Sequence, residues 1–160
     1  MKIVGIDLAG KDRNPTGFCL LTKEGSKAKL LHSDNEILYE IEKIKPDIIA
    51  IDAPFSFPED GHFRDSDVQL RKLGYSPLSP SFPGMQPLVK RAMALIRVLQ
   101  KKYRVIEAFP RAAESILGLE RNKTADKDQY DALLCALTGK HYLEGRYESV
   151  GKEKIIIPQA

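Results

Sequence analysis

Three carboxylates stand where apolar segments of the sequence end. Asp7 is followed by Leu-Ala-Gly, Asp52 by Ala-Pro, and Glu107 by Ala-Phe-Pro, so each acid separates a strand-like run from chain-turning residues. Strands joined by helical crossovers run parallel, and their carboxyl ends share the edge of the sheet where ligands bind. Acids gathered there would repel one another and resist desolvation unless a cation neutralised them. We therefore expect a cation site at this edge.

Two further acids precede a long apolar run. Asp128 and Asp131 are three residues apart, on one face of an expected helix that is apolar almost all round to Leu137. Oxygen-only ligands suit Mg²⁺ or Mn²⁺ better than zinc. Two such ions about 4 Å apart would activate a water and stabilise the leaving oxygen in phosphodiester hydrolysis. The candidate metal ligands are Asp7, Asp52, Asp128 and Asp131, and the candidate catalytic residues are Asp7, Asp52, Glu107 and Asp131.

Each of these acids also has a structural explanation. An acid at the end of a strand is commonly a turn former or a helix cap. Asp128 could favour the positive end of the helix, or pair with Lys127 or Lys123. Glu107 could hold Arg111 in a structural ion pair. Sequence reasoning leaves both explanations open for every candidate.

Basic residues in and after the long Pro- and Ser-rich segment are candidates for binding phosphate. Arg64, Asp67 and Arg71 share a face of a possible short helix, where the arginines could grip a phosphate or simply form ion pairs on a solvated surface. Lys90 opens the next helix and could add a phosphate contact or face solvent. His62 lies alone in a loop, where a histidine is usually incidental. The candidate substrate-binding residues are Arg64, Arg71 and Lys90.

The apolar pattern predicts the elements that would position these residues. The expected strands are residues 2–8, 17–22, 28–32, 47–53 and 103–108, and the expected helices are 36–45, 65–73, 87–102, 112–117 and 124–142. Short connections between the first three strands favour an antiparallel meander. This order fits one α/β domain over residues 1–160 with a mixed sheet.

Composition bounds the class of protein. The chain has 160 residues, 42% hydrophobic and 29% charged, as in ordinary globular domains, and its net charge of +3 permits an anionic partner without demanding one. Cys19 and Cys135 lack metal-ligand spacing, so we expect both to pack as small hydrophobic residues. The first residues do not resemble a signal peptide, and no run reaches the roughly 20 apolar residues of a membrane span. We expect a cytoplasmic protein.

Several segments together resemble a known family. In order they are GIDLAG, PTGFCLL, IAIDAPFSFP, FRDSDVQLRKLG, VIEAFPRA and YDALLCALTG, and they look like the family catalogued as domain of unknown function 429 over about residues 3–142. That family is described as a predicted nuclease. The resemblance implies a ribonuclease-H-like fold, a mixed five-stranded sheet flanked by helices.

The first Asp of a GIDxA segment and the Asp of a D-A-L-x-x-A helix are also similar to Holliday-junction resolvases and their relatives. By that likeness Asp7, Asp52 and Asp131 would be the metal-binding catalytic acids, with Glu107 as an added ligand or base. Asp52 departs from the pattern, since resolvases usually have Glu there. Its shorter side chain could shift the second metal.

These observations predict a Mg²⁺- or Mn²⁺-dependent nuclease that hydrolyses DNA or RNA. Two alternatives stay open. Actin-like ATPases and sugar kinases share this sheet and an early Asp, but clamp ATP between two such domains, which a homodimer of this chain could supply. A catalytically idle module would instead bind a protein through the Pro- and Ser-rich loop of residues 76–86.

Overall fold

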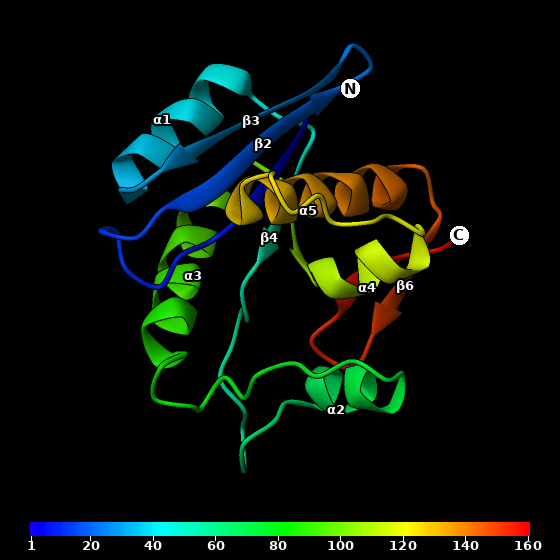
Figure 1. Cartoon of the computed structure of the whole chain (residues 1–160). Coiled ribbons are helices and arrows are strands. Elements are labelled where there is room, and N and C mark those ends of the chain that lie inside the picture. Colours follow the sequence, from blue (N-terminus) through cyan, green and yellow to red (C-terminus); the bar gives the residue numbers. More distant parts are fainter.

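A seven-stranded sheet forms the centre of the molecule, which a computed structural model describes over residues 1–160. Its strands lie in the order β3-β2-β1-β4-β5-β7-β6, with helices on both faces (Figure 1). The strands are β1 Ile3–Asp7, β2 Thr16–Thr22, β3 Gly25–Leu31, β4 Ile48–Asp52, β5 Val105–Ala108, β6 Tyr147–Val150 and β7 Ile155–Pro158. The helices are α1 Asp34–Ile44, α2 Asp65–Lys72, α3 Gln86–Leu99, α4 Pro110–Ile116 and α5 Lys127–Leu143.

The sheet is mixed, as the sequence predicts, but the prediction of five strands is wrong. β1, β2 and β3 form the antiparallel meander, and β4, β5 and β7 continue from β1 as parallel strands. The two additional strands are β6 and β7, an antiparallel pair that follows α5. Each has only four residues, and β6 has the largely exposed sequence Tyr-Glu-Ser-Val. Such a strand shows no apolar alternation, so its pairing with β7 defines it.

Alternate residues of the central strands face opposite helix layers. Ile3 and Ile48 point to α5, whereas their neighbours Val4 and Ile49 point to the layer of α1 and α3. Cys19 and Cys135 are buried free thiols in the α5 layer, as expected of small hydrophobic residues. None of the helices is long and apolar enough to cross a membrane. Whether a residue is at an odd or an even position of its strand therefore decides which helix layer its side chain contacts.

Helix caps set the ends of the helices more exactly than periodicity does. α1 starts at Asp34, two residues before the expected start at residue 36, because Ser33 accepts from the Glu36 amide in a capping box. α5 starts at Lys127 because the Asp126 side chain accepts from the backbone N–H of residue 129. The cap of α5 places Asp128 in the first turn of the helix.

Two glycines let α5 lie directly on the sheet. A Cβ atom on Gly5 would come 2.1 Å from the carbonyl oxygen of Ala132, and one on Gly17 would come 1.9 Å from that of Asp128. Only glycine fits at either position without moving the helix. Gly17 pairs in register with Asp7, so this close packing brings the start of α5 beside the end of β1.

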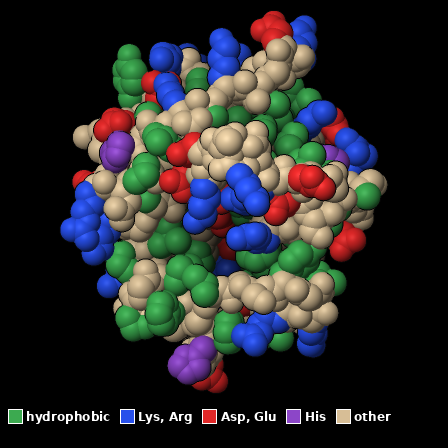
Figure 2. All heavy atoms as spheres, in the orientation of Figure 1, with side chains coloured by type: hydrophobic (Ala, Val, Ile, Leu, Met, Phe, Trp, Pro, Cys, Tyr) green, Lys and Arg blue, Asp and Glu red, His purple; other side chains and the backbone are tan.

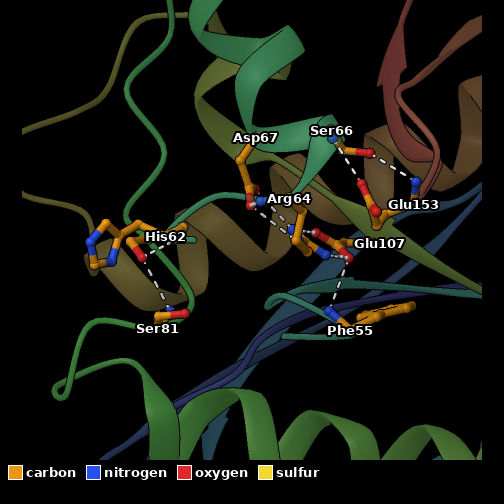
Figure 3. A network of polar contacts seen from close by, with 9 residues as sticks. Phe55, His62, Arg64, Ser66, Asp67, Ser81, Glu107 and Glu153 are labelled. Carbon is orange, nitrogen blue, oxygen red and sulfur yellow. Dashed lines mark hydrogen bonds and ion pairs between the residues drawn. The ribbon is translucent and has the colours of Figure 1, made fainter. Parts of the chain in front are cut away.

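A smaller layer covers the far part of the sheet. Side chains of α2, α4, β6 and β7 form a separate apolar cluster, Leu70, Ala112, Val150, Ile155 and Ile157. Ser66 at the start of α2 donates its amide to Glu153 at 2.8 Å and accepts from the Glu153 amide at 3.0 Å (Figure 3). These reciprocal bonds fasten α2 to the turn between β6 and β7.

Candidate functional site

Asp7 and Asp52 lie side by side at the ends of adjacent parallel strands. The two residues are paired in register between β1 and β4. Gly5 in β1 and Ala50 in β4 face α5, and Asp7 and Asp52 lie two positions after them. Because every second residue of a strand points to the same face, both carboxylates project from the α5 face of the sheet. Both remain partly exposed. The structure thus brings together the two acids that the sequence places first.

α5 adds two more carboxylates to this face. Asp128 and Asp131 both lie close enough to Asp7 for their charges to raise its pKa, and Asp131 also acts on Asp52. Asp131 is largely buried and Asp128 partly exposed. We call Asp7, Asp52, Asp128 and Asp131 the aspartate cluster.

The aspartate cluster holds its carboxylates in an unfavourable environment. Burial, and then the charges of Asp52, Asp131 and Asp128, raise the pKa of Asp7 to about 9. Burial and the charges of Asp131 and Glu107 likewise raise the pKa of Asp52 to about 7, although the hydrogen-bonding side chain of Asp7 and the charge of Lys127 oppose the rise. At neutral pH protons therefore partly neutralise the cluster, in the role that a bound cation would take.

Asp131 has a partner that no pattern in the sequence indicates. Arg121, in the segment between α4 and α5, donates from Nη2 to Asp131 Oδ1 at 2.7 Å. Its Nε lies 3.4 Å from Glu114 Oε2, and its guanidinium lies 4.7 Å from the centre of the Tyr130 ring. Arg121 stands outside any periodic segment, and no spacing links it to Asp131. Only the folded arrangement reveals the pair.

The chemistry of the aspartate cluster fits a hard divalent cation, although its present geometry is not a complete ligand set. In the structure no group of three or more His, Cys, Asp or Glu side chains is arranged to hold a metal ion. The donors are all carboxylate oxygens, the type that Mg²⁺ and Mn²⁺ prefer. Asp7 and Asp52 carry no ion pair, whereas Asp131 is held by Arg121. Asp131 would have to leave Arg121 to become a third ligand.

Glu107 lies apart from the aspartate cluster, on the opposite face of the sheet. In register it is paired with Ile51 on one side and Ile155 on the other, not with Asp52. Its carboxylate accepts from Arg64 Nη1 at 2.9 Å and Nη2 at 2.7 Å, and from the Phe55 amide at 2.9 Å (Figure 3). The ion pair considered from the sequence exists, but with Arg64 instead of Arg111.

Arg64 is occupied within the protein. It is only 3% exposed, and Asp67 accepts from its Nε and Nη2 at 3.0 Å each, in addition to the two bonds to Glu107. Burial disfavours the charge, but the bonds to Glu107 and Asp67 outweigh it and raise the pKa of Arg64 further. In this conformation four of the five guanidinium N–H donors of Arg64 are engaged by Asp67 and Glu107, so the side chain is committed to contacts within the protein. We call Arg64, Asp67 and Glu107 the arginine network.

The other basic candidates remain accessible. Arg71 is exposed and stacks over Phe63 at 4.6 Å, and Lys90 is exposed at the start of α3. His62 is exposed, and its ring points away from the arginine network (Figure 3). Beside the N-terminal end of α5 the surface is hollowed, with acidic side chains inside and several Lys and Arg side chains around it (Figure 2).

A small cavity lies between Asp52 and the arginine network. It has a volume of about 60 Å³, and Asp52, Arg64 and Glu107 line it together with apolar side chains such as Leu78 and Met85. A space of this size has room for a few water molecules but not for a nucleotide.

Comparison with known families adds an identification. The sequence pattern of the family described as protein of unknown function (DUF429) matches residues 5–124. The chain belongs to this family. The part that matches DUF429 includes Asp7, Asp52 and the arginine network, and it ends before α5. No curated protein matches the chain.

Proposed function

We propose that this DUF429 protein is a divalent-cation-dependent nuclease that hydrolyses phosphodiester bonds of DNA or RNA. The observation that carries the proposal is the pairing of Asp7 with Asp52, which lack a basic partner and face the acids of α5. Uncompensated, partly buried carboxylates reduce stability, and perturbed groups of this kind concentrate at functional sites. Acids with a purely structural role usually have a positively charged partner, as Glu107 has in Arg64.

The topology supports a ribonuclease-H-like fold as the frame of this proposal. An antiparallel meander, β1 to β3, is followed by β4 and β5, which are added parallel to β1 on its other side. The first acid ends the central strand and the last helix covers the face to which that acid points. In this reading β6 and β7 extend the sheet beyond the five strands of the basic fold.

The residues of the aspartate cluster have separate tasks in the proposed reaction. Asp7 and Asp52 would hold Mg²⁺ or Mn²⁺ between adjacent strands, and Asp131 would complete the ligand set from α5. Bound cations would supply the positive charge that stabilises attacking and leaving oxygens in phosphodiester hydrolysis. Lys127, close enough to lower the pKa of Asp52, would meet a substrate phosphate at the rim. Asp128 would position the first turn of α5 or bind a second cation.

Glu107 and Arg64 have a supporting task in this proposal. Glu107 accepts the amide of Phe55, three residues beyond Asp52, and so fixes the chain where it leaves β4. Arg64 joins that point to α2 through Asp67. The arginine network would hold the end of β4 in place, while the exposed Arg71 and Lys90 remain candidates for phosphate contacts.

Metal-dependent cleavage of a substrate panel tests the proposal. Labelled single strands, duplexes, four-way junctions and RNA–DNA hybrids would be incubated with Mg²⁺ or Mn²⁺. We expect cleavage of at least one class, abolished in Asp7→Asn and Asp131→Asn and retained in Asp60→Asn, which alters an exposed loop acid. Chelation of the cation should stop the reaction.

The pattern of failure identifies the alternatives. Cleavage that persists in Asp7→Asn would assign the activity to a contaminant or to another site and reject the proposal. No cleavage, together with a Mn²⁺-dependent rise in melting temperature in wild type only, would favour nucleotide or small-phosphate chemistry at the same acids. No cleavage and no response to Mn²⁺ would favour an interaction module.

A further inference from the structure

We propose that Arg121 is a displaceable counter-ion of the aspartate cluster, which exchanges Asp131 for Glu114 when a divalent cation binds. This inference rests on the proposed function, because it assigns the residues that control cation binding at that site. Arg121 and Glu114 are positioning residues here, since neither would touch the substrate.

The present pairing blocks one ligand. Arg121 Nη2 lies 2.7 Å from Asp131 Oδ1, and the Arg121 side chain is 27% exposed and that of Asp131 12% exposed. A cation and a guanidinium compete for the same carboxylate, because the guanidinium that occupies the oxygen also repels a second positive charge. Cation binding therefore requires Arg121 to move away from Asp131.

A second acceptor already stands beside Arg121. Glu114 Oε2 is 3.4 Å from Arg121 Nε, and both atoms are buried without a hydrogen-bond partner, as is the hydroxyl of Tyr130. Unsatisfied buried polar atoms are costly and few in folded proteins, so three in one contact group require an explanation. A small movement of the guanidinium toward Glu114 would satisfy at least two of them. Arg121 thus contacts both acids in the present structure, Asp131 closely and Glu114 more loosely, and release of Asp131 would let it close on Glu114.

The surroundings allow this movement without rearranging the sheet. Arg121 lies between α4 and α5, in a segment that has neither helix nor strand, and Gly118 at its beginning has a φ of +64°. Glu114 is fixed on α4, and Asp131 is fixed on α5 by the close contact of that helix with Gly5. Both acceptors lie on regular helices and Arg121 lies on a connecting segment, so the arginine is the partner that we expect to move.

A cation titration of four proteins tests the exchange. Mn²⁺ affinity would be measured by calorimetry and by thermal shift for wild type, Arg121→Gln, Glu114→Gln and the double variant. We expect Arg121→Gln to bind Mn²⁺ about tenfold more tightly, because Asp131 no longer has to leave a partner. Glu114→Gln should bind several-fold more weakly, because the displaced guanidinium loses its second acceptor.

The double variant gives the decisive comparison. Once Arg121 is absent, Glu114→Gln should have no further effect on Mn²⁺ affinity, so the two changes are strongly non-additive. Arg121→Lys keeps a competing charge and should bind Mn²⁺ nearly as wild type does. Arg111→Gln, which alters an exposed arginine of α4, is the matched control and should leave the affinity unchanged.

The outcomes separate this inference from the proposed function. Equal or weaker Mn²⁺ binding by Arg121→Gln, with metal-dependent cleavage intact in wild type, would overturn the exchange alone. Additive effects of the two substitutions would also overturn it. Absence of Mn²⁺ binding in all variants, including Arg121→Gln, would overturn both the exchange and the cation site.

Discussion

Two groups of acids at neighbouring strand ends have opposite electrostatic surroundings. In the arginine network, Glu107 receives three hydrogen bonds and shares Arg64 with Asp67. In the aspartate cluster, Asp7 and Asp52 face other carboxylates, and their pKa values rise to about 9 and about 7. The first group is fully paired and sealed from solvent, whereas the second is partly exposed and short of positive charge.

The difference teaches that register, more than the type of residue, assigns the role of a strand-end acid. Asp52 is the last residue of β4, whereas Glu107 is the second-last residue of β5 and is paired with Ile51. A shift of one position turns a side chain to the other face of the sheet. One acid therefore meets α5 and its carboxylates, and the other meets the segment that carries Arg64.

The largest expected effect is on the arginine network. Arg64→Met would leave Glu107 and Asp67 as buried carboxylates without a counter-ion, and should lower the free energy of unfolding by about 3–5 kcal/mol. Urea unfolding measures this loss. Arg111→Met, which alters the exposed arginine that could have paired with Glu107, should change stability by less than about 0.5 kcal/mol. Similar losses in both variants would refute the structural role of Arg64.

The next effect concerns the packing that brings α5 to the aspartate cluster. A Cβ atom in Gly17→Ala would lie 1.9 Å from the backbone of Asp128, so helix and strand must separate. We expect a loss of about 2–3 kcal/mol in stability and weaker Mn²⁺ binding, seen by thermal unfolding with and without the ion. In Gly10→Ala the nearest atom is 3.5 Å from the new Cβ, so this control should be nearly neutral.

A smaller effect, of opposite sign, is expected in the aspartate cluster. The folded-state pKa of Asp7 is raised from 3.8 to about 9, so wild type without metal should lose stability as pH rises between these values. Asp7→Asn escapes this loss and should be about 1–2 kcal/mol more stable than wild type at pH 8, a gain limited by solvent screening.

The pH profile distinguishes this explanation from a general gain in packing. Melting temperatures of wild type and Asp7→Asn should nearly coincide at pH 4 and diverge steadily toward pH 9. A constant difference across this range would contradict repulsion within the aspartate cluster as its cause. Saturating Mn²⁺ should stabilise wild type and leave Asp7→Asn almost unaffected.

The smallest effect on stability contrasts Arg71 with Arg64. Arg71 is exposed and makes only a stacking contact with Phe63, so Arg71→Ala should cost about 0.5 kcal/mol. If Arg71 contacts phosphate, the same change should weaken nucleic-acid binding and reduce its salt dependence. Fluorescence anisotropy at several salt concentrations measures both. Unchanged affinity and salt slope would remove Arg71 from the substrate contacts.

Apolar runs and chain-turning residues were enough to predict most of the sheet and the positions of Asp7 and Asp52. β6 was missed because its four residues are largely exposed, and β7 was missed because its apolar run of three isoleucines is short and gains its place in the sheet only by pairing with β5. Periodicity reports local burial, and therefore cannot identify a strand that distant partners define.

Long-range geometry also limits what the sequence shows of the site. The face of the sheet to which Glu107 points follows from its pairing with Ile51, and no local sequence pattern predicts that pairing. Arg64 resembles a surface residue of an amphipathic helix, yet it is buried because two carboxylates surround it. Arg121 pairs with Asp131 from a segment without regular structure, so only the folded structure shows that it belongs to the site.

The position of β7 has a consequence for the order in which the protein folds. β1, β2 and β3 pair through short connections, so that meander can form early, but β7 must join β5 across a long stretch of chain. Until it does, β5 is an edge strand and Glu107 lacks its neighbour Ile155. The side chains of the arginine network therefore lose their contact with water late in folding. We expect the last step to be the pairing of β7 with β5, which covers Glu107 after it has paired with Arg64.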